Sequence, residues 1–179
     1  AANTLTTVAG IPFYQGDTGS IYTHDVSGTD DTATSNTAYG ITAMDAITTG
    51  DNNTAIGHGA LGANTTGTNN TGLGQGALDA SSTGSANTAV GRDALGANTT
   101  ADNNTAVGNY CLAVNTTGTN NIAMGSDTMA ANTTGSRNLA IGAGAYDSSD
   151  TENDNIAIGF DAMSTNTAGG QYNIAIGNY

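Results

Sequence analysis

Glycine-rich runs are the stretches of this sequence that first suggest a binding site. Gly72-x-Gly74-x-Gly76 and Gly142-x-Gly144 resemble loops whose backbone N–H groups cradle a phosphate. Such a loop also needs a lysine that reaches the phosphates, and neither run is followed by one. The glycine pattern therefore predicts turns and not a nucleotide site.

The two histidines, His24 and His58, would have to be the bases of any hydrolytic triad. His58 occupies a slot that changes identity each time the surrounding pattern recurs, the other occupants being Gln75, Arg92, Asn109 and Ser126. A slot that accepts neutral and cationic side chains alike is typical of a solvent-facing position. The sequence predicts that the chain is not an enzyme.

The densest acidic run contains Asp147, Asp150, Glu152 and Asp154. Carboxylate oxygens are the ligands that Ca²⁺ prefers, so these four residues are the candidates for a structural calcium site. The Gly-Gly-x-Gly-x-Asp repeat of calcium-binding β-rolls is absent, however, and acidic loops are usually solvated. We therefore expect no cofactor, with Ca²⁺ as the one open alternative.

The charge balance excludes two classes of partner. The chain has 15 Asp and Glu against 2 Lys and Arg, which gives a formal net charge of −13. Almost no cation is present to neutralise nucleic-acid phosphates or anionic lipids.

No apolar run approaches the ~20 residues of a membrane-spanning helix. Arg92 and Arg137 are the only trypsin sites, which suits a protein exposed to extracellular proteases.

The chain is an internal repeat. The unit Asn-x-Ala/Gly-Φ-Gly, in which Φ is apolar, recurs nine times, at intervals of 17 residues with a final interval of 18. Its first residue is Asn36, Asn53, Asn70, Asn87, Asn104, Asn121, Asn138, Asn155 and Asn173. Chance does not produce such spacing, so the repeat must be the architectural unit.

The pattern inside each repeat is strand-like. In Asn-Ile-Ala-Ile-Gly, Ile156 and Ile158 would point to one face and Ala157 to the other. Gly closes each strand, and Asn-Thr-Thr-Gly has turn chemistry. We predict an all-β chain, a β-solenoid or parallel β-roll of 17-residue coils with two short strands per coil. At ~4.8 Å per coil, the rod would be on the order of 40 Å long.

Stacking turns each position of the repeat into a column of like residues. The Asn column should hydrogen-bond from coil to coil, and the Leu/Met and Ile/Val columns should fill a thin core. Cys111 replaces an alanine and should be a buried small apolar residue. The second position is Thr in five repeats and then becomes Ile122, Leu139, Ile156 and Ile174, which predicts a drier, thicker core in the C-terminal half.

A thin core buries little apolar surface, so we expect the coil to associate with other copies. The small residues of the Ala column would let another backbone approach closely. The predicted self-association residues are Ala55, Ala89, Ala106, Ala123, Ala140, Ala157 and Ala175.

The two ends differ from the repeat. Residues 1–35 are predicted to be an N-terminal cap or docking segment with strand-like pieces at 4–8 and 20–23, and residues 36–179 form the repeat region. The last repeat ends one strand into a new coil, and an open coil is a template for pairing. In an end-to-end filament the docking residues would be Phe13, Tyr14, Tyr22, Ile174 and Ile176.

The stretch NTAIGHGALGANTTGTNNTGLGQGAL resembles the NTAIG-x-x-AL-x-x-NTTG repeats of phage tail-fibre-like and bacterial surface proteins. It is more distantly similar to the β-roll heads of trimeric autotransporter adhesins. The resemblance covers residues 36–179 and implies a left-handed parallel β-roll with three chains per fibre, used for display or host attachment. The repeat here is longer than the adhesin-head repeat, so the cross-section should differ.

These features predict a structural fibre protein located outside the cell, on a cell surface or on a virion. Its partners would be itself, as a homotrimer, and a surface glycan or protein receptor bound through the variable slots. The alternative is a head-to-tail filament subunit. Ice binding through regular Thr columns is less favoured, because adjacent residues such as Thr65 and Thr66 should point to opposite faces.

Overall fold

The computed structural model describes residues 6–8, 11–15, 21–22, 32–148, 150–165 and 170–178. These residues form one twelve-stranded sheet in which spatial order follows chain order, and they contain no helix. The strands are β1 (Thr6–Val8), β2 (Ile11–Gln15), β3 (Ile21–Tyr22), β4 (Thr37–Tyr39), β5 (Thr54–Ile56), β6 (Thr71–Leu73), β7 (Thr88–Val90), β8 (Thr105–Val107), β9 (Ile122–Met124), β10 (Leu139–Ile141), β11 (Ile156–Ile158) and β12 (Ile174–Ile176).

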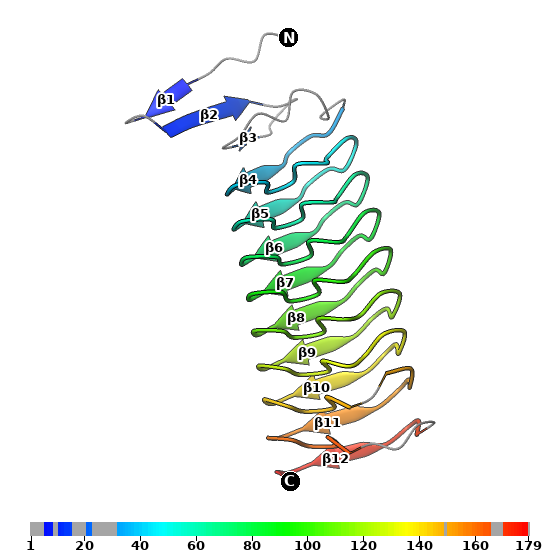
Figure 1. Ribbon diagram of the computed structural model, residues 1–179. Helices are drawn as coiled ribbons and strands as arrows, with labels where there is room; N and C mark the ends of the chain where they lie inside the picture. Colours follow the sequence, from blue (N-terminus) through cyan, green and yellow to red (C-terminus); the bar gives the residue numbers. More distant parts are fainter. Residues whose placement is uncertain are drawn as a thin grey trace.

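Strands β4 to β12 stack in parallel, each pairing with the equivalent residues of the next coil (Figure 1). Thr54 lies opposite Thr71, and Ile56 opposite Leu73. The predicted all-β solenoid of 17-residue coils is confirmed. Successive coils stack at the inter-strand spacing of a parallel sheet, ~4.8 Å.

The prediction of two strands per coil is wrong, because each coil contributes only one. Ala60 and Leu61 are consecutive and both fully buried, which the alternation of a strand does not allow. Leu61 has a φ of 52°, and this left-handed conformation turns both side chains inward. The segment still bonds to the next coil, since the Leu61 N–H donates to the Ala77 carbonyl at 3.0 Å.

The N-terminal strands continue the same sheet. β1 and β2 pair in antiparallel fashion, as do β2 and β3, and β3 then pairs in parallel with β4. The strand-like pieces expected at 4–8 and 20–23 correspond to β1 and β3. β2 was not predicted; it contains Pro12, a residue that strands seldom include.

The alanine column fills the interior, and the large aliphatic residues of the strands point outward. Ala55 is fully buried, whereas Ile56 is 40% exposed. The coil is too narrow to hold the large aliphatic side chains inside. A Cβ built on Gly72, which lies in the alanine column, would be 3.1 Å from the Ala77 carbonyl oxygen and 3.5 Å from Leu61 Cγ. The interior at this position therefore accepts a methyl group and nothing larger.

This orientation corrects three predictions. Ala55, Ala89, Ala106, Ala123, Ala140 and Ala157 are buried within their own coils and Ala175 is half-buried in the last one, so they cannot form a self-association face. The Ile/Val column is outside the core. The change from Thr to Ile122, Leu139, Ile156 and Ile174 likewise alters the outer surface and not the core.

The Asn column forms the predicted ladder along the rod. The Oδ1 of Asn53 accepts the backbone N–H of Asn70 at 2.9 Å, and the Nδ2 of Asn70 donates to the Gly84 carbonyl of its own coil at 2.7 Å. The same two bonds recur in the coils above and below. Each asparagine side chain thus links its own coil to the next coil and also bonds across its own coil.

A second buried ladder follows the turn. The side chain of Asn64 accepts the Gly67 N–H and donates to the Gly67 carbonyl, both at 3.1 Å. Asn98, Asn115 and Asn132 hold the same position in later coils. Ser81 interrupts this column, and its buried hydroxyl has no hydrogen-bond partner among the described residues.

Replacing Ser81 with asparagine is expected to raise the free energy of unfolding by about 1–2 kcal/mol. The new amide would bond to Gly84 as Asn64 does to Gly67, and would remove the unpartnered hydroxyl. Urea unfolding followed by circular dichroism measures the change. Ser81→Ala is the matched control and should be near neutral, so a Ser81→Asn variant no more stable than Ser81→Ala would contradict the prediction.

Candidate functional site

The candidate site is the outer face of the sheet, defined as the two columns that flank the central residue of strands β4 to β12. The burial pattern of each strand places its first and third residues outward. The first column consists of Thr37, Thr54, Thr71, Thr88, Thr105, Ile122, Leu139, Ile156 and Ile174. The second consists of Tyr39, Ile56, Leu73, Val90, Val107, Met124, Ile141, Ile158 and Ile176.

The outer face is an extended, uncharged and largely apolar surface on a strongly acidic chain. Leu73 and Met124, in the middle of the stack, remain 43% and 42% exposed although neighbours in the column lie above and below them. Neither column contains a charged residue, while the chain carries a formal charge of −13. Nine coils of three residues span on the order of 400 Å². This is within the size range of the largest exposed patch on a typical monomer, and such patches often have a function.

The variable slots lie at the corner that follows each strand. His58, Gln75, Arg92, Asn109 and Phe160 are all at least partly exposed, which confirms the solvent-facing position predicted for His58. The Arg92 guanidinium donates to the Asp93 carboxylate at 3.0 Å and lies 4.6 Å from the centre of the Tyr110 ring. These slots are separate from the outer face and are open to other molecules.

The glycine runs belong to the fold and form no anion cradle. Gly72 takes the alanine position at the centre of β6, and Gly74 and Gly76 form the corner after that strand with φ of 138° and 67°. Gly142 and Gly144 likewise form the corner that follows β10. His24 lies outside the described residues.

Cys111 is buried in the interior, as predicted for a small apolar residue. Burial raises the pKa of its thiol to about 12, so the reactive thiolate is almost absent at neutral pH. Its role is that of the alanines that occupy the same column in other coils.

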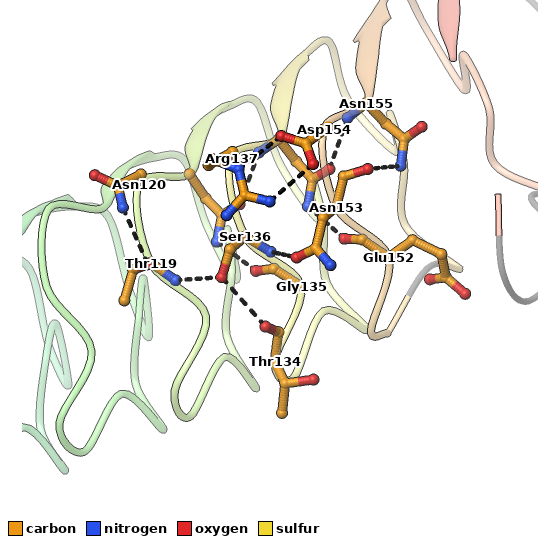
Figure 2. Close-up of polar contacts among 12 residues, drawn as sticks. Thr119, Asn120, Thr134, Gly135, Ser136, Arg137, Glu152, Asn153, Asp154 and Asn155 are labelled. Carbon is orange, nitrogen blue, oxygen red and sulfur yellow. Dashed lines mark hydrogen bonds and ion pairs between the residues drawn. The ribbon is translucent and has the colours of Figure 1, made fainter. Parts of the chain in front are cut away.

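The acidic run is spread over one coil and does not converge. Asp154 pairs with Arg137 of the preceding coil through bonds of 2.6 and 2.8 Å, and this pairing lowers the pKa of the Asp154 carboxyl (Figure 2). Glu152 is nearly fully buried, whereas Asp150 is exposed. Within the described ranges, no group of three or more His, Cys, Asp or Glu side chains could hold a metal. The calcium site stays a prediction.

Polar side chains around this pair continue the coil-to-coil bonding. Figure 2 shows the Thr119 N–H bonded to Ser136 Oγ at 3.0 Å, and the Ser136 N–H bonded to Asn153 Oδ1 at 2.7 Å. The Thr65 hydroxyl likewise donates to the Ser82 carbonyl of the next coil at 3.0 Å, while Thr66 is exposed. Many of these polar groups are therefore already hydrogen-bonded to neighbouring coils of the same chain.

The residues predicted to dock end to end are placed differently from one another. Tyr22 is fully buried, and its hydroxyl lies 3.5 Å from Asn36 Nδ2, so it already packs in its own chain and cannot dock on another. Ile174 and Ile176 are 70% and 73% exposed and belong to the outer face. The side chains of Phe13 and Tyr14 lie outside the described part of the chain, although their backbone forms part of β2.

No family model, curated protein or solved structure matches the chain. No helix long and apolar enough to cross a membrane occurs in the described residues.

Sequence reasoning missed the outer face, although its residues form a regular pattern. One signal was the absence of charge from the second and fourth repeat positions in all nine repeats. A second was the alanine between them, which is small enough for a narrow interior. Together these two patterns point to an apolar surface outside the coil.

Proposed function

We propose that this chain is a non-enzymatic structural module of an extracellular or virion-surface fibre, in which copies associate side by side through the outer face. The observation that carries the proposal is the uncharged, largely apolar strip that runs from β4 to β12. Burying such a strip against other copies removes apolar area from water without burying a carboxylate. The resemblance to trimeric fibre repeats favours three chains per fibre.

In this fibre the variable slots would supply the contacts with a surface glycan or protein receptor. They recur along the rod on solvent-facing corners, and they carry imidazole, amide, guanidinium and phenyl groups in His58, Gln75, Arg92, Asn109 and Phe160. Each contact would be weak, and several along one rod would act together.

Sedimentation velocity tests the side-by-side association. The chain should sediment as an oligomer, and the double variant Leu73→Asp/Ile141→Asp should sediment as a monomer of 17.6 kDa. Both side chains point outward, so the monomer should stay folded while each buried carboxylate weakens association at least tenfold, by roughly 1.4 kcal/mol or more.

The matched control is Thr66→Asp/Thr117→Asp, which adds the same charge at exposed turn positions away from the outer face. It should remain oligomeric. A wild-type chain that stays monomeric at all accessible concentrations would contradict the proposal. Thermal hysteresis by that monomer would favour ice binding through the Thr column of β4 to β8, and end-to-end polymers would favour the filament alternative.

A further inference from the structure

Aspartates border the outer face on both sides. Because its strands are parallel, their carboxyl ends lie along one border and their amino ends along the other. Each of these aspartates lies at most three residues from a strand of the outer face and is half-buried or exposed. Those that follow a strand are Asp93, Asp127 and Asp161, and those that precede one are Asp51, Asp102 and Asp154. The uncharged strip is thus bordered by carboxylates.

Two of the border carboxylates are neutralised within the chain. Asp93 pairs with Arg92, and Asp154 pairs with Arg137 of the preceding coil (Figure 2). Lys and Arg number 2 in the whole chain. Both cations are therefore used on the borders of the outer face, and neither remains for the other four carboxylates.

Neutral donors hold border carboxylates that have no arginine. The Oδ1 of Asp102 accepts the Ser85 N–H at 2.7 Å. The Oδ2 of Asp127 accepts the Ser126 hydroxyl at 2.8 Å. Such bonds fix the position of a negative charge without cancelling it, so the charge belongs to the border and not to a freely moving side chain.

We infer that these borders make lateral association depend on ionic strength, so that copies separate in dilute buffer and associate in salt. The inference rests on the proposed lateral association and adds its regulation. When two outer faces meet, the borders of both copies lie at the rim of the contact, since three residues reach at most about 11 Å. Like charges at a rim oppose association and make it depend on salt.

Salt acts on this repulsion and not on the attraction between the faces. The Debye length is ~30 Å at 0.01 M ionic strength, which exceeds the reach from strip to border, and ~8 Å at 0.15 M, which does not. The contact itself would bury uncharged side chains such as Leu73 and Met124, which have no charge to screen.

Sedimentation velocity of the chain at neutral pH, in about 0.01 M and about 0.15 M NaCl, tests the inference. Association should be at least about tenfold weaker in the dilute buffer. Circular dichroism should be the same in both buffers, which separates dissociation from unfolding by self-repulsion.

Removing border charges should abolish part of the salt dependence. Asp127→Asn/Asp161→Asn should associate about tenfold more tightly than the wild type in dilute buffer and about equally in 0.15 M NaCl. Both residues have a left-handed φ, of 54° and 50°, which asparagine also adopts, so the coil should keep its shape.

Removing the two arginines should have the opposite effect. Arg92→Gln/Arg137→Asn leaves two more border carboxylates unpaired and should dissociate further in dilute buffer. Gln75 and Asn120 hold the same repeat positions in other coils, so both substitutions use residues that the coil already accepts.

The matched control is Asp79→Asn/Asp147→Asn, which removes the same net charge from positions away from the borders. These two residues directly follow the buried Leu78 and Tyr146, six residues after a strand. The control should tighten association in dilute buffer less than Asp127→Asn/Asp161→Asn does.

The outcomes separate this inference from the proposed function. Wild-type oligomers of equal affinity in both buffers would overturn the salt dependence and leave lateral association standing. Equal shifts in the border variant and its control would show that net charge, and not the borders, sets the response. A wild-type chain that is monomeric in both buffers at all accessible concentrations would remove the proposed function and this inference together.

Discussion

Replacing Gly91 with alanine is expected to destabilise the rod by more than about 4 kcal/mol. A Cβ at this position would lie 2.3 Å from the carbonyl oxygen of Gly108 in the next coil, which is far inside van der Waals contact. Gly91 also has a φ of 133°, a conformation that L side chains rarely adopt. The methyl group can be accommodated only by separating the coil of Gly91 from the coil of Gly108.

Urea unfolding and amide hydrogen exchange measure this effect at two levels. The midpoint should fall sharply, and exchange should accelerate first at the Gly108 N–H, which bonds to the Val90 carbonyl at 2.8 Å across the same junction. Each coil contacts only its neighbours, so coils farther away should keep more of their protection.

Gly177 provides a matched control for the steric part of this effect. It holds the same repeat position with a φ of 142°, yet a Cβ there would meet nothing within 4 Å. Gly177→Ala should therefore cost only the backbone strain, about 1–3 kcal/mol, and only in the last coil. Equal losses of stability in the two variants would show that the carbonyl contact is not the cause.

Asn87→Ala is the second substitution with a large expected effect, about 3–5 kcal/mol. The Asn87 amide accepts the Asn104 N–H at 3.0 Å and donates to the Ala101 carbonyl at 2.8 Å and to Asn70 Oδ1 at 3.2 Å. Alanine would leave the Asn104 N–H buried without an acceptor and would open a cavity in the ladder. Thermal unfolding followed by circular dichroism measures the loss.

Two comparison variants test whether the loss of stability comes from the broken ladder or from the removal of any asparagine. Asn103→Ala should be mild, because Asn103 is exposed and Ala86 holds the same position one coil earlier. Asn87→Asp should be unstable at neutral pH, where a carboxylate would face two acceptors, and should recover as pH falls, because the protonated acid regains a donor. An Asn87→Ala variant as stable as Asn103→Ala would refute the ladder's contribution.

Both predictions involve columns that the repeat pattern alone makes visible. Asn87 and Gly91 recur at fixed places in the repeat, which indicates a coil-to-coil role for each, since stacking demands the same bonds at every level. The Asn ladder, the buried Cys111 and the solvent-facing His58 slot were predicted correctly for this reason.

The second apolar segment of each coil was wrongly predicted to be a strand, because its backbone conformation is unusual. The pair Ala60-Leu61 has the composition of another strand, but the leucine adopts a left-handed φ that branched and bulky residues seldom use. Met44 and Met129 do the same in other coils, with φ of 55° and 53°. Nothing in the apolar pattern indicates that conformation, which the surrounding coils impose through bonds from above and below.

The sequence by itself determined the period, the strand at its centre, the glycine corner and the polar ladder, because these are local or strictly repeated requirements. It did not determine which face of the strand is inside. That choice depends on the width of the closed coil, which is set by how Leu61 and the Ala77 carbonyl approach the strand. Only a methyl fits there, so Ala55 is buried and Ile56 is left on the outer face.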